Sequence, residues 1–168
     1  MEVRRGSCAP DVRSVVGMLI SLFRTAVAWT VVGLVGGLAY REVTKAFEFT
    51  GRTQLALVHT HALVLGVLLP LLLLALVAAL PGLGTDRWLR RGVHVLNAGL
   101  VLTVGMLAYK GVLQVAGAAH AGSAALAGVS GLGHMLLTAA LGLVLVGVGR
   151  AVRTAAAPGT AELVGDLP

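Results

Sequence analysis

The sequence predicts an all-α membrane protein, a bundle of four transmembrane helices with both termini in the cytoplasm (N-in/C-in). Of its 168 residues, 57% are hydrophobic and 12% are charged, and the mean hydropathy is +0.92. A soluble domain carries about 25% charged residues, so this chain lacks the charge to cover a surface in water. Its apolar residues also gather into four runs, and its basic residues lie in the gaps between them.

Each run is close to the roughly 20 residues that a spanning helix needs. The first contains Arg24, whose long stem can carry its charge to the membrane surface. The second has no charged residue. The third lies between Trp88 and Tyr109, aromatic residues of the kind enriched at membrane interfaces, and the fourth ends at Arg150. We expect these spans at about residues 22–40, 55–80, 89–109 and 124–149.

The lysine and arginine residues set the predicted orientation, because they are enriched in cytoplasmic loops. Nine of the 13 flank the two termini and the loop between the second and third spans, and four lie near the other two loops. We therefore expect a cytoplasmic N-terminal segment (1–21), a disordered cytoplasmic tail (151–168) and a multi-pass protein of the plasma membrane, with the lipid bilayer as its first partner.

Charge and cysteine content exclude several function classes. The net charge is +6, but the basic residues are not gathered on one face, as a nucleic-acid interface requires. The single cysteine, Cys8, excludes an internal disulfide and a cysteine metal cluster. No Asp or Glu lies inside a predicted span, which argues against a carboxylate-based proton pump or cation transporter. Gly33 and Gly37 form a G-x-x-x-G pair of the kind that lets helices approach closely, which also permits a homo-oligomer.

Four of the five histidines fall inside or beside the spans, where ionisable residues are functional candidates. Counting residues along the second and fourth spans places His61 and His134 at similar depth near the outer edge of the membrane. His59 lies about 200° from His61 around the helix, so the two cannot face one partner. His94 starts from the opposite side and cannot share their site, and His120 lies in a loop.

Two neutral imidazoles from two helices can ligate a haem iron axially, and bundle cores hold such cofactors. We therefore expect haem b between the second and fourth helices, with His61 and His134 as axial ligands and His59 as a supporting group or alternative ligand. Electron transfer, or an accessory role beside a respiratory or other redox partner, would follow. Small residues and cations around the histidines would provide a slot for the ring and partners for its propionates: Gly131, Gly133, Gly66, Arg41, Lys45 and Arg52.

Two other hypotheses stay open. A copper or other transition-metal ion would use His61, His134 and His59 as metal ligands, with Met106 or Met135 for Cu(I). Alternatively, the histidines hydrogen-bond between helices in a structural subunit that holds no ligand. Pro70 removes a backbone donor in the second span and should bend that helix.

A family resemblance is carried by YREVTKAFEFTGRTQLALVHTHALVLG together with NAGL, KGVLQV and SGLGHMLL. Over roughly residues 25 to 150, the chain resembles a bacterial family of four-span integral membrane proteins known only as a domain of unknown function. The resemblance implies the four-span topology and no activity.

A more distant resemblance concerns the run His59 to Gly66, H-x-H-x-x-x-x-G. It is similar to a span in proteins related to subunit I of haem-copper oxidases, where a histidine in an apolar helix ligates a haem and a proline follows. His61 and Pro70 would be the matching positions. There is no adjacent histidine pair for a copper centre, and four spans replace twelve, so this resemblance implies haem binding rather than oxygen reduction.

Overall fold

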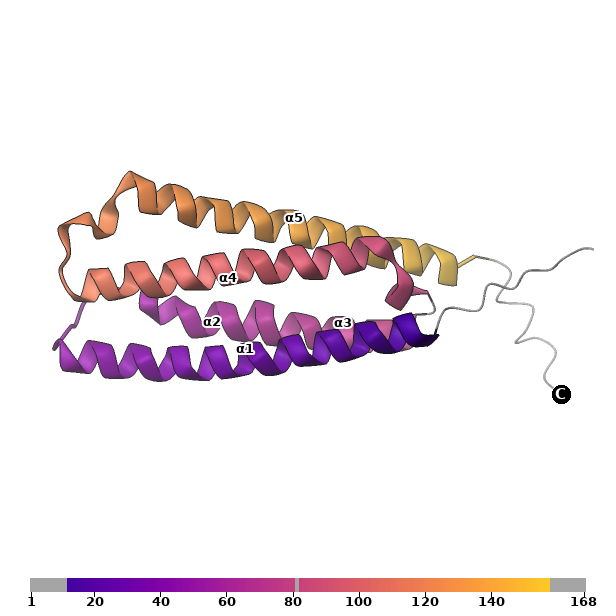
Figure 1. Cartoon of the computed structure of the whole chain (residues 1–168), viewed down its shortest axis with the longest axis horizontal. Coiled ribbons are helices and arrows are strands. Elements are labelled where there is room, and N and C mark those ends of the chain that lie inside the picture. The colour runs from indigo at the N-terminus through magenta and orange to yellow at the C-terminus, as the bar shows by residue number, and fades with distance from the viewer. Residues whose placement is uncertain (1–11, 81, 158–168) are drawn as a thin grey trace, which may run out of the picture.

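The computed structural model describes residues 12–80 and 82–157, and in them all regular structure is helical. Four helices are long and apolar enough to cross a membrane, as predicted (Figure 1). The second of these is divided into four consecutive segments. In chain order, the elements are α1 (Val12–Ala46), η1 (Gln54–Leu57), α2 (Val58–Leu63), η2 (Val64–Leu68), α3 (Leu69–Ala79), η3 (Leu83–Thr85), α4 (Arg87–Val115), η4 (Ala119–Gly122) and α5 (Ala124–Ala155).

The helices extend beyond the predicted spans. The chain is helical from Val12, ten residues before the predicted start of the first span, and to Ala155, past the predicted end of the last. Hydropathy marks the part of a helix that fits hydrocarbon, whereas hydrogen bonding continues into the polar flanks. Lys110, expected near a loop, lies inside α4 for the same reason, and it is buried. The tail predicted to be disordered from residue 151 begins later, because residues 151–155 continue α5. Residues 158–168 of that predicted tail lie outside the described part of the chain.

Close contacts at glycines hold the helices in two packed layers. α5 packs mainly on α4, and α1 packs on the second span (Figure 1). A Cβ atom added to Gly33 would lie 2.6 Å from Leu63, and one added to Gly133 would lie 2.6 Å from Thr103. The close approach predicted for the Gly33–Gly37 pair is therefore observed at Gly33, with α2 as the partner helix. The second close approach is at Gly36, next to Val58, and not at Gly37, where an added Cβ would lie 3.7 Å from the His59 Cβ.

The second span changes its helical form in the middle. η2 is a π-helix, in which the backbone N–H of Leu69 donates to the carbonyl of Val64. Pro70 follows at once and has no N–H to continue an α-helical ladder. The Trp29 ring of α1 packs on Gly66 in this segment, and its Nε1 donates to Asn97 Oδ1 of α4 over 3.0 Å. The irregular turn thus lies where three spans meet.

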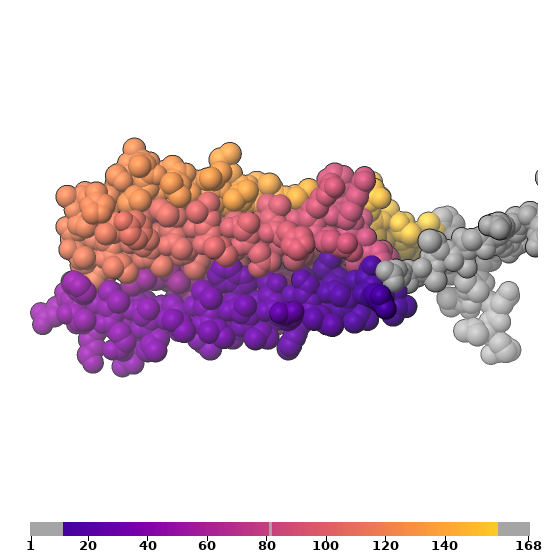
Figure 2. All heavy atoms as spheres, in the orientation of Figure 1, coloured from indigo at the N-terminus to yellow at the C-terminus, as the bar shows by residue number. Residues whose placement is uncertain are grey.

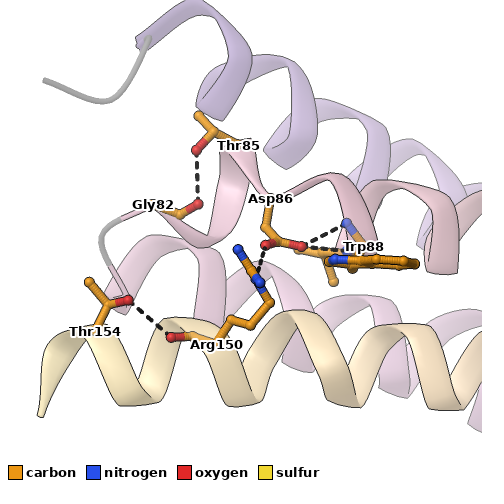
Figure 3. A network of polar contacts seen from close by, with 7 residues as sticks. Gly82, Thr85, Asp86, Trp88, Arg150 and Thr154 are labelled. Carbon is orange, nitrogen blue, oxygen red and sulfur yellow. Dashed lines mark hydrogen bonds and ion pairs between the residues drawn. The ribbon is translucent and has the colours of Figure 1, made fainter. Parts of the chain in front are cut away.

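At the end of the bundle where α1 begins and α5 ends, Asp86 connects α4 to α5 (Figure 3). One carboxylate oxygen accepts the backbone N–H groups of Trp88 and Leu89 over 2.7 and 3.0 Å, which caps α4. The other oxygen lies 3.3 Å from Nε of Arg150 on α5. We call this the capped end.

At the opposite end, which we call the hairpin end, the loop before the second span is bound to α4. The Thr53 hydroxyl donates to the carbonyl of Gly111 over 2.8 Å, and the backbone N–H of Gln54 donates to the Gln114 side chain over 2.7 Å. Gly111 permits this approach because a Cβ there would collide with the backbone of Leu55. The loop therefore fixes the height of α2, and with it the position of His61.

Candidate functional site

His61 of α2 and His134 of α5 meet near the hairpin end. Their ring centroids are 6.4 Å apart, and the ring planes cross at 81°. Each of the two helices packs against α4. The predicted meeting of these two residues is observed, while their role as ligands stays a prediction.

Both rings are oriented by the same backbone contact. Nδ1 of His61 lies 3.0 Å from the carbonyl of Leu57, and Nδ1 of His134 lies 3.0 Å from the carbonyl of Ser130. A carbonyl accepts hydrogen bonds only, so Nδ1 carries the proton when the ring is neutral. Nε2 of each ring then has a lone pair, and neither Nε2 makes a hydrogen bond to another described residue. Metal-binding histidines typically have one nitrogen bonded to a carbonyl and the other on the metal.

His59 lies on a different side of the second span. Its ring atoms approach Gly37 of α1, where an added Cβ would be 3.7 Å from the His59 Cβ. Its Nε2 is 3.4 Å from the hydroxyl of Thr60, and its Nδ1 is buried with no hydrogen-bond partner among the described residues. This arrangement agrees with the prediction that His59 and His61 face different partners. It also separates His59 from the histidine pair.

The basic residues expected to serve the propionates differ in their surroundings. Arg41 lies 3.6 Å from Glu42 in an exposed ion pair, so its charge already has a partner. Arg52 lines a cavity of about 460 Å³ together with Tyr40, Leu57 and Gln114. Leu57 also supplies the carbonyl that orients His61. The cavity of Arg52 is therefore bordered by a residue that also contacts His61, and Arg41 is not among the residues that line it.

Of the three glycines expected to form a slot, Gly131 alone leaves open space. No atom lies within 4 Å of the position of its Cβ, and it precedes His134 by less than one turn. Gly66 is covered by Trp29, and Gly133 is covered by Thr103. These two glycines serve helix packing, so the prediction that they form a slot for the cofactor was wrong. The sequence alone could not show this, because helix packing and a cofactor slot both favour glycine.

The donors around the pair are few. No group of three or more His, Cys, Asp or Glu side chains that could hold a metal ion occurs in residues 12–80 and 82–157. Met135 follows His134 and is 69% exposed. The pair therefore offers two nitrogen donors, which suits a cofactor that brings its own equatorial ligands better than it suits a bare ion.

The remaining histidines lie elsewhere. His94 lines a separate cavity near the capped end together with Arg90, and His120 is exposed in η4. Both positions agree with the prediction that neither shares the site of His61. Two features near the pair were missed from the sequence: the orienting carbonyls of Leu57 and Ser130. The sequence gives no signal of this contact, because the acceptor is a backbone carbonyl, which every residue has.

The sequence pattern of a family described as protein of unknown function (DUF2871) matches residues 19–151. The chain belongs to this family. The matched region of this DUF2871 protein includes the histidine pair, Arg52 and Gly131, but the family's description assigns none of them a role. Neither a curated protein nor a solved structure matches the chain.

Proposed function

We propose that this protein binds haem b between α2 and α5, with His61 and His134 as axial ligands, and that it serves electron transfer or assists a respiratory complex in the plasma membrane. The observation that carries the proposal is the pair of imidazoles with their Nε2 atoms left available, 6.4 Å apart between ring centroids. Bound there, the cofactor would supply one-electron redox chemistry.

The separation of the rings supports a single metal between them. An imidazole nitrogen binds a metal at roughly 2.0 Å, so two such bonds in line, with half a ring at each end, span about the observed distance between centroids. Two rings at 81° to each other can both stand on opposite faces of one flat macrocycle.

The chain's own residues would hold the ring in place. Gly131 leaves room beside His134, and Arg52 offers a guanidinium to a propionate from the cavity that it lines. Because Arg41 is already paired with Glu42, we assign it a smaller part. Similarity to haem-copper oxidase subunit I and a bacterial source stay predictions.

The proposed orientation, with the capped end in the cytoplasm, rests on the distribution of basic residues. In the sequence, nine of the 13 lysine and arginine residues flank the two termini or the loop between the second and third spans. Of the four that do not, Lys110 is buried inside α4. The difference in positive charge between the two sides is therefore larger than a count of basic residues over the predicted loops suggests.

The test is the absorption spectrum of the purified protein, expressed with a supply of haem. Reduced protein should show a Soret band and an α-band. His61→Ala and His134→Ala should each remove these bands, because one imidazole alone is a much weaker site. His59→Ala is the matched control and should keep them, since His59 faces α1. Absence of both bands in the wild type, at full helicity by circular dichroism, overturns the proposal.

A copper site is the second candidate, favoured by one observation: Met135, a thioether suited to Cu(I), follows His134. It needs further donors that the described residues do not bring to the pair. Elemental analysis separates the two candidates, because stoichiometric copper without iron supports this one. If neither iron nor copper is bound, the histidines serve as contacts in a structural subunit.

A further inference from the structure

A polar groove runs between α1 and α4 near the capped end. One cavity of about 300 Å³ is lined by residues that include Gly17, Ser21, Arg90 and His94. A second cavity, of about 440 Å³, shares Gly17 and Ser21 with the first and continues to Arg24 and Asn97. Because they share residues, the two cavities form one groove. Figure 2 shows α1 and α4 side by side along the visible face.

The cations of this groove have no anionic partner in the described chain. Between residues 12 and 157, with position 81 excluded, the carboxylates are those of Glu42, Glu48 and Asp86. Glu42 and Glu48 lie at or near the hairpin end, and Asp86 is paired with Arg150. Arg24 and Arg90 therefore bring two positive charges to one groove without a described counter-charge.

Arg24 lies close to the start of the first predicted span, which we expect at about residue 22, and its side chain is exposed. A long basic side chain at this level can reach the polar headgroup region of the membrane. Asn97, which lines the same part of the groove, is already held by Trp29 and by the carbonyl of Val93. An anionic partner of Arg24 therefore comes from outside the described chain.

We propose that the α1–α4 groove binds an anionic phospholipid, whose headgroup phosphate lies between Arg24 and Arg90. Basic pockets between transmembrane helices recognise such headgroups. The groove extends from Ser14 to Ala28, about 21 Å along the helix axis, which is enough for a headgroup and the upper part of its acyl chains. Gly17 provides the room, since no atom lies within 4 Å of its Cβ position. Ser21 and His94 add hydrogen-bonding groups beside the phosphate. The site is independent of the histidine pair.

The test compares lipid binding to the full chain in detergent, by native mass spectrometry and by thermal unfolding with added lipid. Phosphatidylglycerol should bind and raise the Tm, while phosphatidylcholine of the same chains and inorganic phosphate should not. Arg24→Gln and Arg90→Gln should each weaken phosphatidylglycerol binding about tenfold, because each removes a charge-assisted hydrogen bond. Arg91→Gln is the matched control: Arg91 lies over the Trp88 ring outside the groove, and its loss should change binding less than about twofold.

The variant Gly17→Leu distinguishes lipid binding in the groove from a general attraction of anionic lipid to the basic residues. It keeps every charge but fills the hollow, so it should abolish phosphatidylglycerol binding while the protein stays helical. Equal binding of the two lipids, or equal losses from Arg91→Gln and Arg90→Gln, overturns the proposal. Retention of binding in Gly17→Leu overturns it as well, because the lipid would then lie elsewhere. Stabilisation by inorganic phosphate alone would identify a free-anion site instead of a lipid site.

Discussion

Gly66 and Gly131 are both glycines in membrane helices, and their surroundings are opposite. A Cβ on Gly66 would collide with the Trp29 ring, which cannot move easily because its Nε1 is bonded to Asn97. Nothing lies within 4 Å of a Cβ on Gly131. Overpacking costs typically 1–3 kcal/mol, so Gly66→Ala should destabilise the protein by about that amount. Gly131→Ala should be neutral or stabilising, since alanine has the higher helix propensity by roughly 1 kcal/mol.

The measurement is thermal unfolding of both variants in the same detergent, followed by circular dichroism at 222 nm, the far-ultraviolet helix band. The wild type and Gly131→Ala serve as references, so that a general effect of removing glycine is recognised. Equal Tm values for Gly66→Ala and the wild type would show that Trp29 and η2 adjust at little cost, and the packing argument would then fail.

For the histidines, the position along the helix axis was predictable from the sequence, but the direction in which each side chain points was not. Counting residues from the ends of the apolar runs placed His61 and His134 at one level, because a helix rises uniformly. The relative angle of His59 and His61 followed from the same geometry. Which of them faces α5 depends on how the second span is rotated, and its residues are apolar all round. Whether Gly66 and Gly133 are covered by another helix depends on residues of that helix, so it could not be predicted from the local sequence.

Among the elements, the second span departs furthest from regular geometry. Pro70 predicted a bend, but the π-helix of Val64–Leu68 was not predicted. The π turn lies where Trp29 packs on Gly66, and the loop before this span is bound to α4. Neither contact has a periodic signal in the sequence. π turns are frequent at functional sites. Here the turn begins three residues after His61.

A second element-scale feature is the cap of α4. Asp86→Ala should cost about 1–2 kcal/mol, because the backbone N–H groups of Trp88 and Leu89 lose their acceptor. Arg150→Gln breaks only the ion pair with Asp86, and the Arg150 side chain is 62% exposed. Its cost should stay below about 1 kcal/mol. Reversible denaturation in mixed micelles measures both, and a larger loss for Arg150→Gln would show that the ion pair, not the cap, connects α4 and α5.

At the scale of the whole molecule, the number of spans was predictable and their arrangement was not. Four apolar runs separated by basic gaps are visible in the sequence, and four helices result. In a membrane, faces toward lipid and faces toward other helices are equally apolar, and small residues decide which faces meet. Leu34 and Leu145 are 64% and 69% exposed, while Leu22 and Leu100 are fully buried. Leucine alone therefore does not indicate that α5 packs chiefly on α4.

The orientation of the bundle is open to a direct test with single cysteines in a Cys8→Ser background. The basic residues favour the capped end in the cytoplasm, so Glu48→Cys and His120→Cys should react with a membrane-impermeant maleimide in intact cells. Arg153→Cys should react only after the cells are permeabilised. All three positions are exposed, so accessibility to the reagent depends on the side of the membrane and not on burial. Labelling of Arg153→Cys in intact cells, with protection of the other two, would reverse the orientation and place the histidine pair near the cytoplasm.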